Sequence, residues 1–231
     1  SGARVLMARS VEFGRRYNVQ LIEEITYDEM LEMASSGARV LMARSVEFGR
    51  RYNVPIIVKP TFSEGSGTIV KDKVMEQAIV SGVTHNDKEI KFTLFGVPDQ
   101  PGIAGKVFGP LSENGVIVDM IVQNVSKESK TDISFTAPLE QKSEVENILE
   151  NLSTELEAEG ADSDPNIARV SLIGAGMKAE SGIASKMFSI LGENKINIAM
   201  ISTSPIRISC VVNKDDMQKA IDSLHKEFIE A

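Results

Sequence analysis

DQPGIAGKVFGPLSENGVIVDMIVQ, residues 99–123, recurs in looser form 80 residues later as AESGIASKMFSILGENKINIAMIST, residues 179–203. Each copy reads as a loop, a helix with apolar residues on one face, a tight turn and an apolar strand. A supersecondary unit that occurs twice predicts two small domains of one fold that bury a common surface. Ten positions are identical in the two copies: Gly102/Gly182, Ile103/Ile183, Ala104/Ala184, Lys106/Lys186, Phe108/Phe188, Leu111/Leu191, Glu113/Glu193, Asn114/Asn194, Met120/Met200 and Ile121/Ile201.

The flanking sequence extends each copy into a β-α-β-β-α unit. In the first unit Gly115 follows the C-cap of the first helix. The elements expected there are strands at 89–97, 116–125 and 131–138 and helices at 102–113 and 141–158, with a further extended piece near 160–163. The acidic segment 160–166 is interpreted as a linker. The elements expected in the second unit are strands at 168–174, 196–203 and 206–212 and helices at 182–193 and 214–228.

The number of strands predicts how the two units are connected. The second unit has three strands, whereas a ferredoxin-like β-α-β-β-α-β sandwich needs four. The unused apolar strand at 78–83 lies before the first unit and supplies the fourth. We therefore predict an α+β chain in which the first domain (86–163) is inserted into the second (76–85 plus 166–231).

The amino-terminal part, residues 20–74, has a different pattern. Thr26 and Glu29 have the spacing of a capping box, which opens a helix through about Ala34. A second helix is expected at 37–52 and a short strand at 55–59. Residues 1–19 recur unchanged at 36–54, which indicates either a very recent duplication or an accident of cloning or assembly. One surface cannot hold both copies, so residues 1–19 are expected to be badly packed or loosely attached.

Composition excludes several classes of protein. The net charge of −8 argues against a nucleic-acid partner, because phosphate contacts need clustered Lys and Arg. The single cysteine, Cys210, lies in an apolar run and suits a reducing compartment. No apolar stretch is long enough for a membrane span, and the amino terminus does not have the pattern of a signal peptide. We expect a cytoplasmic protein without membrane or nucleic-acid partners.

Motifs of catalysis and of cofactor binding are weak or missing. GAGMKA at 174–179 matches a dinucleotide fingerprint, but its glycines do not open a helix directly, and no acidic residue follows near position 200. His85 and His225 have no second ligand at metal-binding spacing, and His225 is interpreted as part of a solvated helix face. No phosphate loop or nucleophile elbow is visible.

The glycine turns ahead of the two repeated helices are the remaining chemical feature. They expose backbone N–H groups at the positive end of a helix dipole, which can bind a carboxylate without a charged side chain. Asp99, just before the first of these turns, is interpreted either as a plain helix cap or as a ligand-binding carboxylate.

Three stretches resemble the aspartokinase family. VPDQPGIAGKVFGPLSENGVIVDMIVQNVS resembles the first ACT domain of aspartokinases, and SLIGAGMKAESGIASKMFSILGENKINIAMISTSPIRISCVV resembles the second. ITYDEMLEMASSGARVLMARSVEFGRRYNVPIIVKPTFSEGSGT looks like the end of the catalytic domain, so residues 20–74 are expected to be a remnant of the kinase domain. The pattern departs from the family at VLMAR, where VLHPR is usual, and at ESG, where HPG is often found.

The resemblance implies a regulatory role. Aspartokinases transfer phosphate from ATP to aspartate in the route to lysine, threonine and methionine, and their ACT pair binds end-product amino acids. The lysine-bearing phosphate loop and the aspartate-binding residues are not in this sequence. ATP and Mg²⁺ are therefore expected only with a complete kinase. This chain resembles either a fragment of an aspartokinase or a separately made regulatory β subunit, and it is not expected to phosphorylate anything. The predicted partners are threonine or lysine, a second copy in a homodimer, and an aspartokinase catalytic subunit or domain.

The same resemblance places the effector where the loop–helix start of one ACT domain meets the strand edge of another. Backbone groups would come from Gly102, Ile103 and Ala104, and the ammonium would pair with Asp99 or Asp119. Gln123, expected to be a buried amide, and Asn197, with Ile198 beside it, would complete the site. Gln123 could instead only satisfy a neighbouring backbone group. Two other classes stay open, namely an ACT subunit of another amino-acid enzyme and a nucleotide-dependent enzyme.

Overall fold

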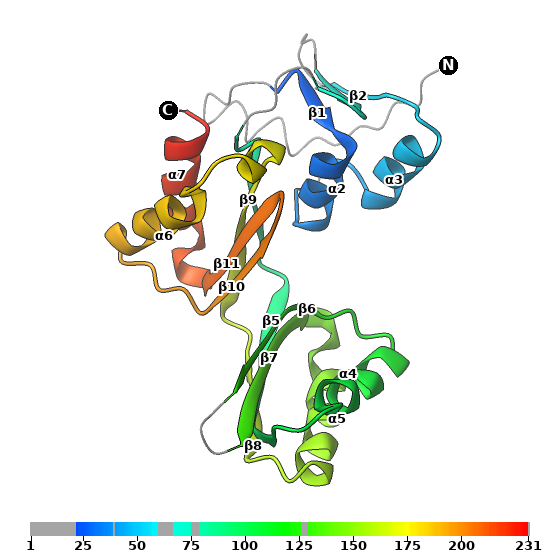
Figure 1. Cartoon of the computed structure of the whole chain (residues 1–231), viewed down its shortest axis with the longest axis vertical. Coiled ribbons are helices and arrows are strands. Elements are labelled where there is room, and N and C mark those ends of the chain that lie inside the picture. Colours follow the sequence, from blue (N-terminus) through cyan, green and yellow to red (C-terminus); the bar gives the residue numbers. More distant parts are fainter. Residues whose placement is uncertain (1–21, 39, 60–66, 75–78, 126–128, 231) are drawn as a thin grey trace.

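The computed structural model describes residues 22–38, 40–59, 67–74, 79–125 and 129–230. Three units follow one another along the length of the molecule, each with its own sheet (Figure 1). In the amino-terminal unit, strands in the order β1-β3-β2 lie beside two helices. The elements of this unit are β1 (Glu24–Thr26), α2 (Tyr27–Ser35), α3 (Ala43–Arg51), β2 (Ile56–Val58) and β3 (Thr68–Lys71).

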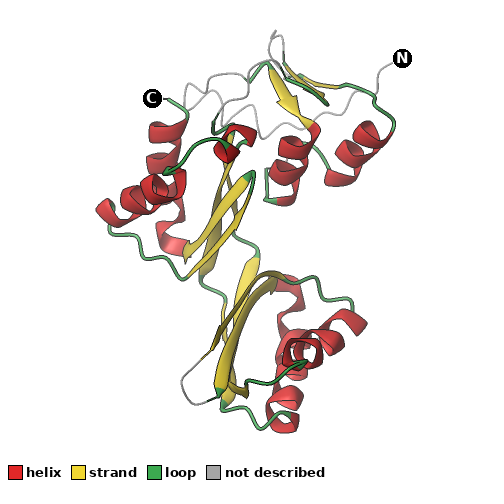
Figure 2. Cartoon of the chain, viewed as in Figure 1, coloured by secondary structure: helices red, strands yellow, loops and turns green. Residues whose placement is uncertain are grey.

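The first repeated unit forms a four-stranded antiparallel sheet with the order β6-β7-β5-β8. Helices α4 and α5 cover one face of this sheet (Figure 2). Its core contains Phe92 and Phe135, with ring centroids 5.5 Å apart, and Val107 and Leu149 from the two helices. The elements are β5 (Glu89–Pro98), α4 (Ile103–Glu113), β6 (Asp119–Val125), β7 (Lys130–Pro138), α5 (Lys142–Glu155) and β8 (Gly160–Asp164).

The second repeated unit has the sheet order β10-β11-β9-β4. Its fourth strand, β4, precedes the first unit in the chain and pairs antiparallel with β9, so the first unit is inserted into the second as predicted. Met187 of α6 and Leu224 of α7 pack on the apolar side of this sheet. The elements are β4 (Gly82–Asn86), β9 (Ile167–Ile173), α6 (Ile183–Glu193), β10 (Met200–Ser204), β11 (Arg207–Asn213) and α7 (Met217–Phe228).

The two sheets meet through a small apolar cluster. Met120 of β6 and Met200 of β10, one of the identical pairs of the repeat, both belong to it, together with Ile167, Val211 and Val122. The shared surface that the repeat predicts is therefore present between corresponding strands of the two units.

Several sequence-based expectations about element bounds and burial differ from the structure. The donated strand is Gly82–Asn86 rather than 78–83, and the helix expected at 37–52 is confined to Ala43–Arg51. The extended piece expected near 160–163 is confirmed as strand β8, which pairs with β5 through Lys91↔Asp164 and its neighbours, so the interpretation of 160–166 as a linker is wrong. His225 is buried rather than solvated, and its Nδ1 lies 3.0 Å from the Glu230 carboxylate. The expectation for residues 1–19 lies outside the described residues.

Candidate effector site and the junctions around it

The two repeated helices begin at glycines with left-handed backbone conformations. Gly102 has φ 88° and Gly182 has φ 95°, and each is the N-cap of its helix without a side-chain cap. A β-carbon at either position would meet no atom within 4 Å, so glycine is favoured there by its backbone angle and not by crowding. The space beside each helix start is therefore open to a ligand.

Gly102, Ile103 and Ala104, the residues predicted to bind the effector through their backbone groups, form the start of helix α4. The N–H of Ile103 already donates to the carbonyl of Gln100 at 3.1 Å, and the Ile103 side chain is buried in the core. Ala104 lies in the first turn and is exposed. Because first-turn N–H groups have no intrahelical partner, Ala104 is better placed than Ile103 to donate to a carboxylate.

Asp99 lies at the edge of this loop with an exposed side chain. Its N–H donates to the carbonyl of Ser129 at 2.8 Å, which ties the loop to the start of β7. The interpretation of Asp99 as a helix cap is wrong, because the N-cap is Gly102 and no side chain caps the helix.

Asp119 and Gln123 lie on β6, an edge strand of the sheet. The Asp119 carboxylate is already engaged by Arg169 and accepts a hydrogen bond from its neighbour Met120 N–H at 2.8 Å. Gln123 is exposed rather than buried, since β6 has a hydrogen-bonded neighbour on one side only. Its amide makes no hydrogen bond with the described residues, so it does not satisfy a neighbouring backbone group there.

Asn197 and Ile198 lie in the connection that leads into β10 of the second unit. Asn197 is exposed, whereas Ile198 packs against the core of the second unit. The apolar cluster brings β6 and β10 together through Met120 and Met200. Neither the loop of Asp99 nor the helix start at 102–104 belongs to that cluster.

A buried ionic network that sequence reasoning missed crosses the boundary between the two repeated units. Arg169 is only 2% exposed and contacts the carboxylates of Asp119 and Glu89, the latter at 2.7 Å. Arg207 lies 3.9 Å from Asp119 and 3.2 Å from Glu32 of helix α2. Burial raises the pKa of Glu89 above its usual value, and the charge of Arg169 offsets this only in part. The signal in the sequence was an arginine inside the apolar strand IARVSLI.

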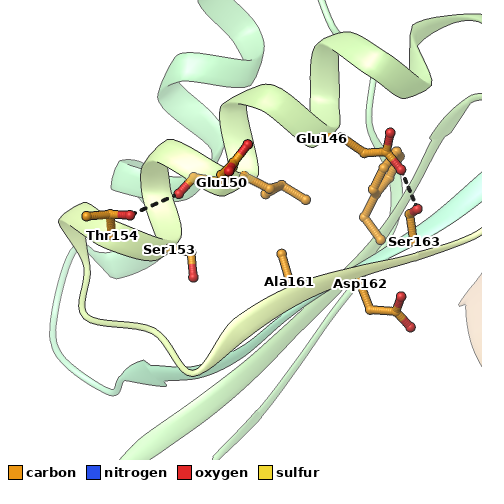
Figure 3. Close-up of a pocket in the computed structure, with 9 residues that line it drawn as sticks. Glu146, Glu150, Ser153, Thr154, Ala161, Asp162 and Ser163 are labelled. Carbon is orange, nitrogen blue, oxygen red and sulfur yellow. Dashed lines mark hydrogen bonds between the residues drawn. The ribbon is translucent and has the colours of Figure 1, made fainter.

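A hollow in the described part of the chain lies elsewhere, between α5 and β8 (Figure 3). It has a volume of about 490 Å³ and is lined by Glu146, Glu150, Asp162 and neutral side chains. Glu146 accepts a hydrogen bond from Ser163 at 2.6 Å, and no predicted site residue lines the hollow. Its acidic lining is unsuited to the carboxylate of an amino acid.

The described residues include possible metal ligands and the single cysteine, Cys210. They contain no group of three His, Cys, Asp or Glu side chains that could hold a metal ion. Burial raises the pKa of Cys210 to about 12, so its thiol is unreactive at neutral pH. In GAGMKA, residues Ala175–Lys178 form a 3-10 turn and the helix begins only at Ile183, which is not the geometry of a dinucleotide fingerprint. Within the described ranges, no helix is both long and apolar enough to cross a membrane.

These features define the class of protein. Two ferredoxin-like units with an open glycine turn before the first helix are ACT domains, and family models for the ACT domain match residues 91–157 and 170–228. The solved regulatory subunit of aspartate kinase from Thermus thermophilus is 37% identical, with a TM-score of 0.62. The match covers 65% of this chain and 99% of that one.

Curated relatives point to the same family. Aspartate kinase from Pseudomonas fluorescens is 45% identical over 212 residues, which are 90% of this chain and 51% of the relative. An aspartokinase from Helicobacter pylori is 41% identical over 89% of this chain and 52% of its own length. The chain thus belongs to the aspartokinase family, and it spans about half the length of these curated relatives.

Proposed function

We propose that this chain is the allosteric amino-acid-binding region of an aspartokinase, with lysine or threonine as its effector. The observation that carries the proposal is the pair of ACT domains with 37% identity to an aspartate kinase regulatory subunit. Effector binding would control the ATP-dependent phosphorylation of aspartate by a catalytic partner. Residues 20–74, which pack on the second ACT domain through α2, would be the end of the kinase domain.

The phosphoryl transfer would belong to that partner. ATP and Mg²⁺ would be needed only by the complete kinase.

The effector site would lie at the helix start of the first ACT domain. At the repeat offset, Asp99 and Gln123 correspond to Ala179 and Thr203, so the first copy carries a carboxylate and an amide where the second has a methyl group and a hydroxyl. The exposed carboxylate of Asp99 would pair with the ammonium, and the N–H of Ala104 would donate to the effector carboxylate. Asp119 is less suited to the ammonium, because Arg169 already occupies its carboxylate.

A second copy of the chain would complete this site. The edge strands expose Ile121 and Ile201, an identical pair of the repeat, at 52% and 43%. Apolar edge strands need a neighbour, and pairing in a symmetric homodimer would cover them and bring Asn197 toward the ligand. Light scattering should report a dimer; a monomer at all concentrations, with and without effector, would contradict this assembly.

Calorimetric titration tests the class of ligand. Lysine, threonine, methionine and NAD would each be titrated into the full chain. The proposal expects heat with lysine or threonine and none with NAD. Heat with NAD alone would favour a nucleotide-dependent enzyme, and no heat with any amino acid would contradict the proposed function. An ACT subunit of another enzyme is less well supported, because the relatives described above are all aspartokinases.

Gln123→Ala tests the position of the site. Removing the amide should leave a ligand group unpaired and weaken effector binding by about 1–3 kcal/mol. Folding should change little, because the side chain is exposed. Gln218→Ala, an exposed glutamine on α7, is the matched control and should bind as the parent does. If Gln123→Ala binds effector as tightly as the parent, the site lies elsewhere.

A further inference from the structure

The carboxylate of Glu29 joins helix α2 to the second ACT domain. The Glu29 side chain is buried, and its Oε2 accepts hydrogen bonds from the backbone N–H and the hydroxyl of Thr26, at 3.2 and 2.7 Å. These contacts close the capping box that starts α2. Its Oε1 accepts from the Ser81 hydroxyl at 2.5 Å and from the Ala175 N–H at 2.8 Å. One carboxylate therefore caps the helix and holds the ACT domain.

The backbone segments around Ser81 and Ala175, which both contact Glu29, are closely packed against each other. Ser81 N–H donates to the carbonyl of Ile173 at 2.6 Å, which ties the entry to β4 to the end of β9. A β-carbon on Gly174 would lie 2.2 Å from the carbonyl oxygen of Ile79, so these two backbones are in close contact. Ala175 begins the loop that leads to Gly182 and helix α6. That loop cannot shift at Ala175 without disturbing its contact with Glu29.

The same face of α2 makes two more contacts with this domain. Glu32, one turn after Glu29, pairs with Arg207 at the start of β11, 3.2 Å away. A β-carbon on Gly82 of β4 would lie 2.7 Å from the terminal methyl of Met33. Spacings of three and four residues place Glu29, Glu32 and Met33 on one face of the helix, which is the face that docks on the ACT sheet.

Separating the Glu29 carboxylate from its hydrogen-bond donors would cost free energy. No ion pair to Glu29 is formed by the residues that the structure describes. A buried carboxylate without a countercharge depends on its hydrogen-bond donors, and losing one is expensive. Because both oxygens belong to one planar group, a movement that frees Oε1 from Ala175 also disturbs Oε2 at the cap.

We propose that Glu29 couples the start of helix α2 to the loop 175–182 of the second ACT domain, so that local unfolding of one segment is accompanied by local unfolding of the other. Its regulatory meaning rests on the proposed function. A ligand that orders this loop would stabilise α2, the part of the chain that resembles the kinase domain.

Amide hydrogen exchange of the full chain tests the coupling without any ligand. Glu29→Gln places an NH₂ group opposite donors that need an acceptor. It should speed exchange by at least about tenfold both in residues 27–35 and in residues 175–182. Asp28→Asn removes the same charge from the same helical turn at an exposed site that pairs with Arg50. This control should leave exchange in residues 175–182 unchanged. Faster exchange of the Glu29→Gln helix with an unchanged loop would overturn the proposal.

Ser81→Ala keeps the test decisive if Glu29→Gln does not fold. This variant keeps the carboxylate and removes one of its four donors, so it should speed exchange in both segments by a smaller factor. Unchanged exchange in either segment would count against the coupling.

Repeating the exchange measurement with a bound amino acid distinguishes failure of the coupling from failure of the proposed function. The amino acid that binds in calorimetry should slow exchange in α2 of the parent but not in α2 of Glu29→Gln. If no amino acid binds, the proposed function fails, and the ligand-free comparison still decides the coupling. If an amino acid binds and the Glu29→Gln loop stays protected, the coupling fails and the proposed function stands.

Discussion

A buried arginine lies at the boundary between the two ACT domains and makes ion pairs across it. Arg169 is fully desolvated and depends on Glu89 and Asp119 for compensation. Replacing one partner of a buried pair is costly, because the other charge is left without compensation. Arg207 and Glu32 extend the network from this boundary to α2, so the ionic contacts link all three units.

Glu89→Gln should change how stability depends on pH. Burial raises the pKa of Glu89 in the folded chain, whereas in the unfolded chain it ionises at its ordinary value. As the pH rises from the ordinary pKa to the raised one, the unfolded state loses its proton first, and the free energy of unfolding falls. The variant lacks this contribution. Urea unfolding at a series of pH values should therefore show the difference, parent minus variant, falling with pH in that window; a difference that rises would contradict the assignment.

Among the helices, α4 and α6 have the same C-cap residue but differ in the residue that follows it. Asn114 and Asn194 are the C-caps of α4 and α6, and each side-chain amide donates to the carbonyl four residues earlier at 2.8 Å. The next residue has a positive φ in both copies, 71° at Gly115 and 59° at Lys195. Glycine accepts this conformation without strain and lysine does not.

Exchanging these two residue types should change stability in opposite directions. Gly115→Ala should lower the free energy of unfolding by about 1 kcal/mol. A β-carbon there meets no atom within 4 Å, so the backbone is the cause. Lys195→Gly should raise the free energy of unfolding by a smaller amount, because relief of strain is offset by the entropy of the unfolded glycine. Chemical denaturation measures both; two changes of the same sign would contradict this explanation.

The repeat made most of the elements predictable. Apolar periodicity and the Gly115 signal located α4, α6 and their following strands, and the strand count predicted the insertion. Exposure was harder to predict: Gln123 and His225 were misjudged because burial depends on which strand lies at a sheet edge and on which helix face meets the core. The contacts of Arg169 and Glu29 join residues far apart in the sequence, and no local pattern specifies them.

At the scale of the whole molecule, the described units have their own cores without residues 1–19. Deleting that duplicated segment should therefore leave the thermal unfolding temperature nearly unchanged. Calorimetry of the shortened chain checks this expectation. A fall of more than about 4 °C, which corresponds to roughly 1 kcal/mol or more for a chain of this size, would show that the first copy packs as part of the structure.

We propose that this chain regulates an aspartate kinase through a bound amino acid. A chimera would join residues 20–231 to the part of the Pseudomonas fluorescens aspartate kinase that this chain does not match, in place of the matching segment. The rate of aspartate phosphorylation would then be followed with and without lysine, threonine and methionine. Inhibition by the amino acid that binds the free chain is the predicted result, with relief in the Gln123→Ala variant. An active chimera whose rate none of these amino acids alters would contradict the account.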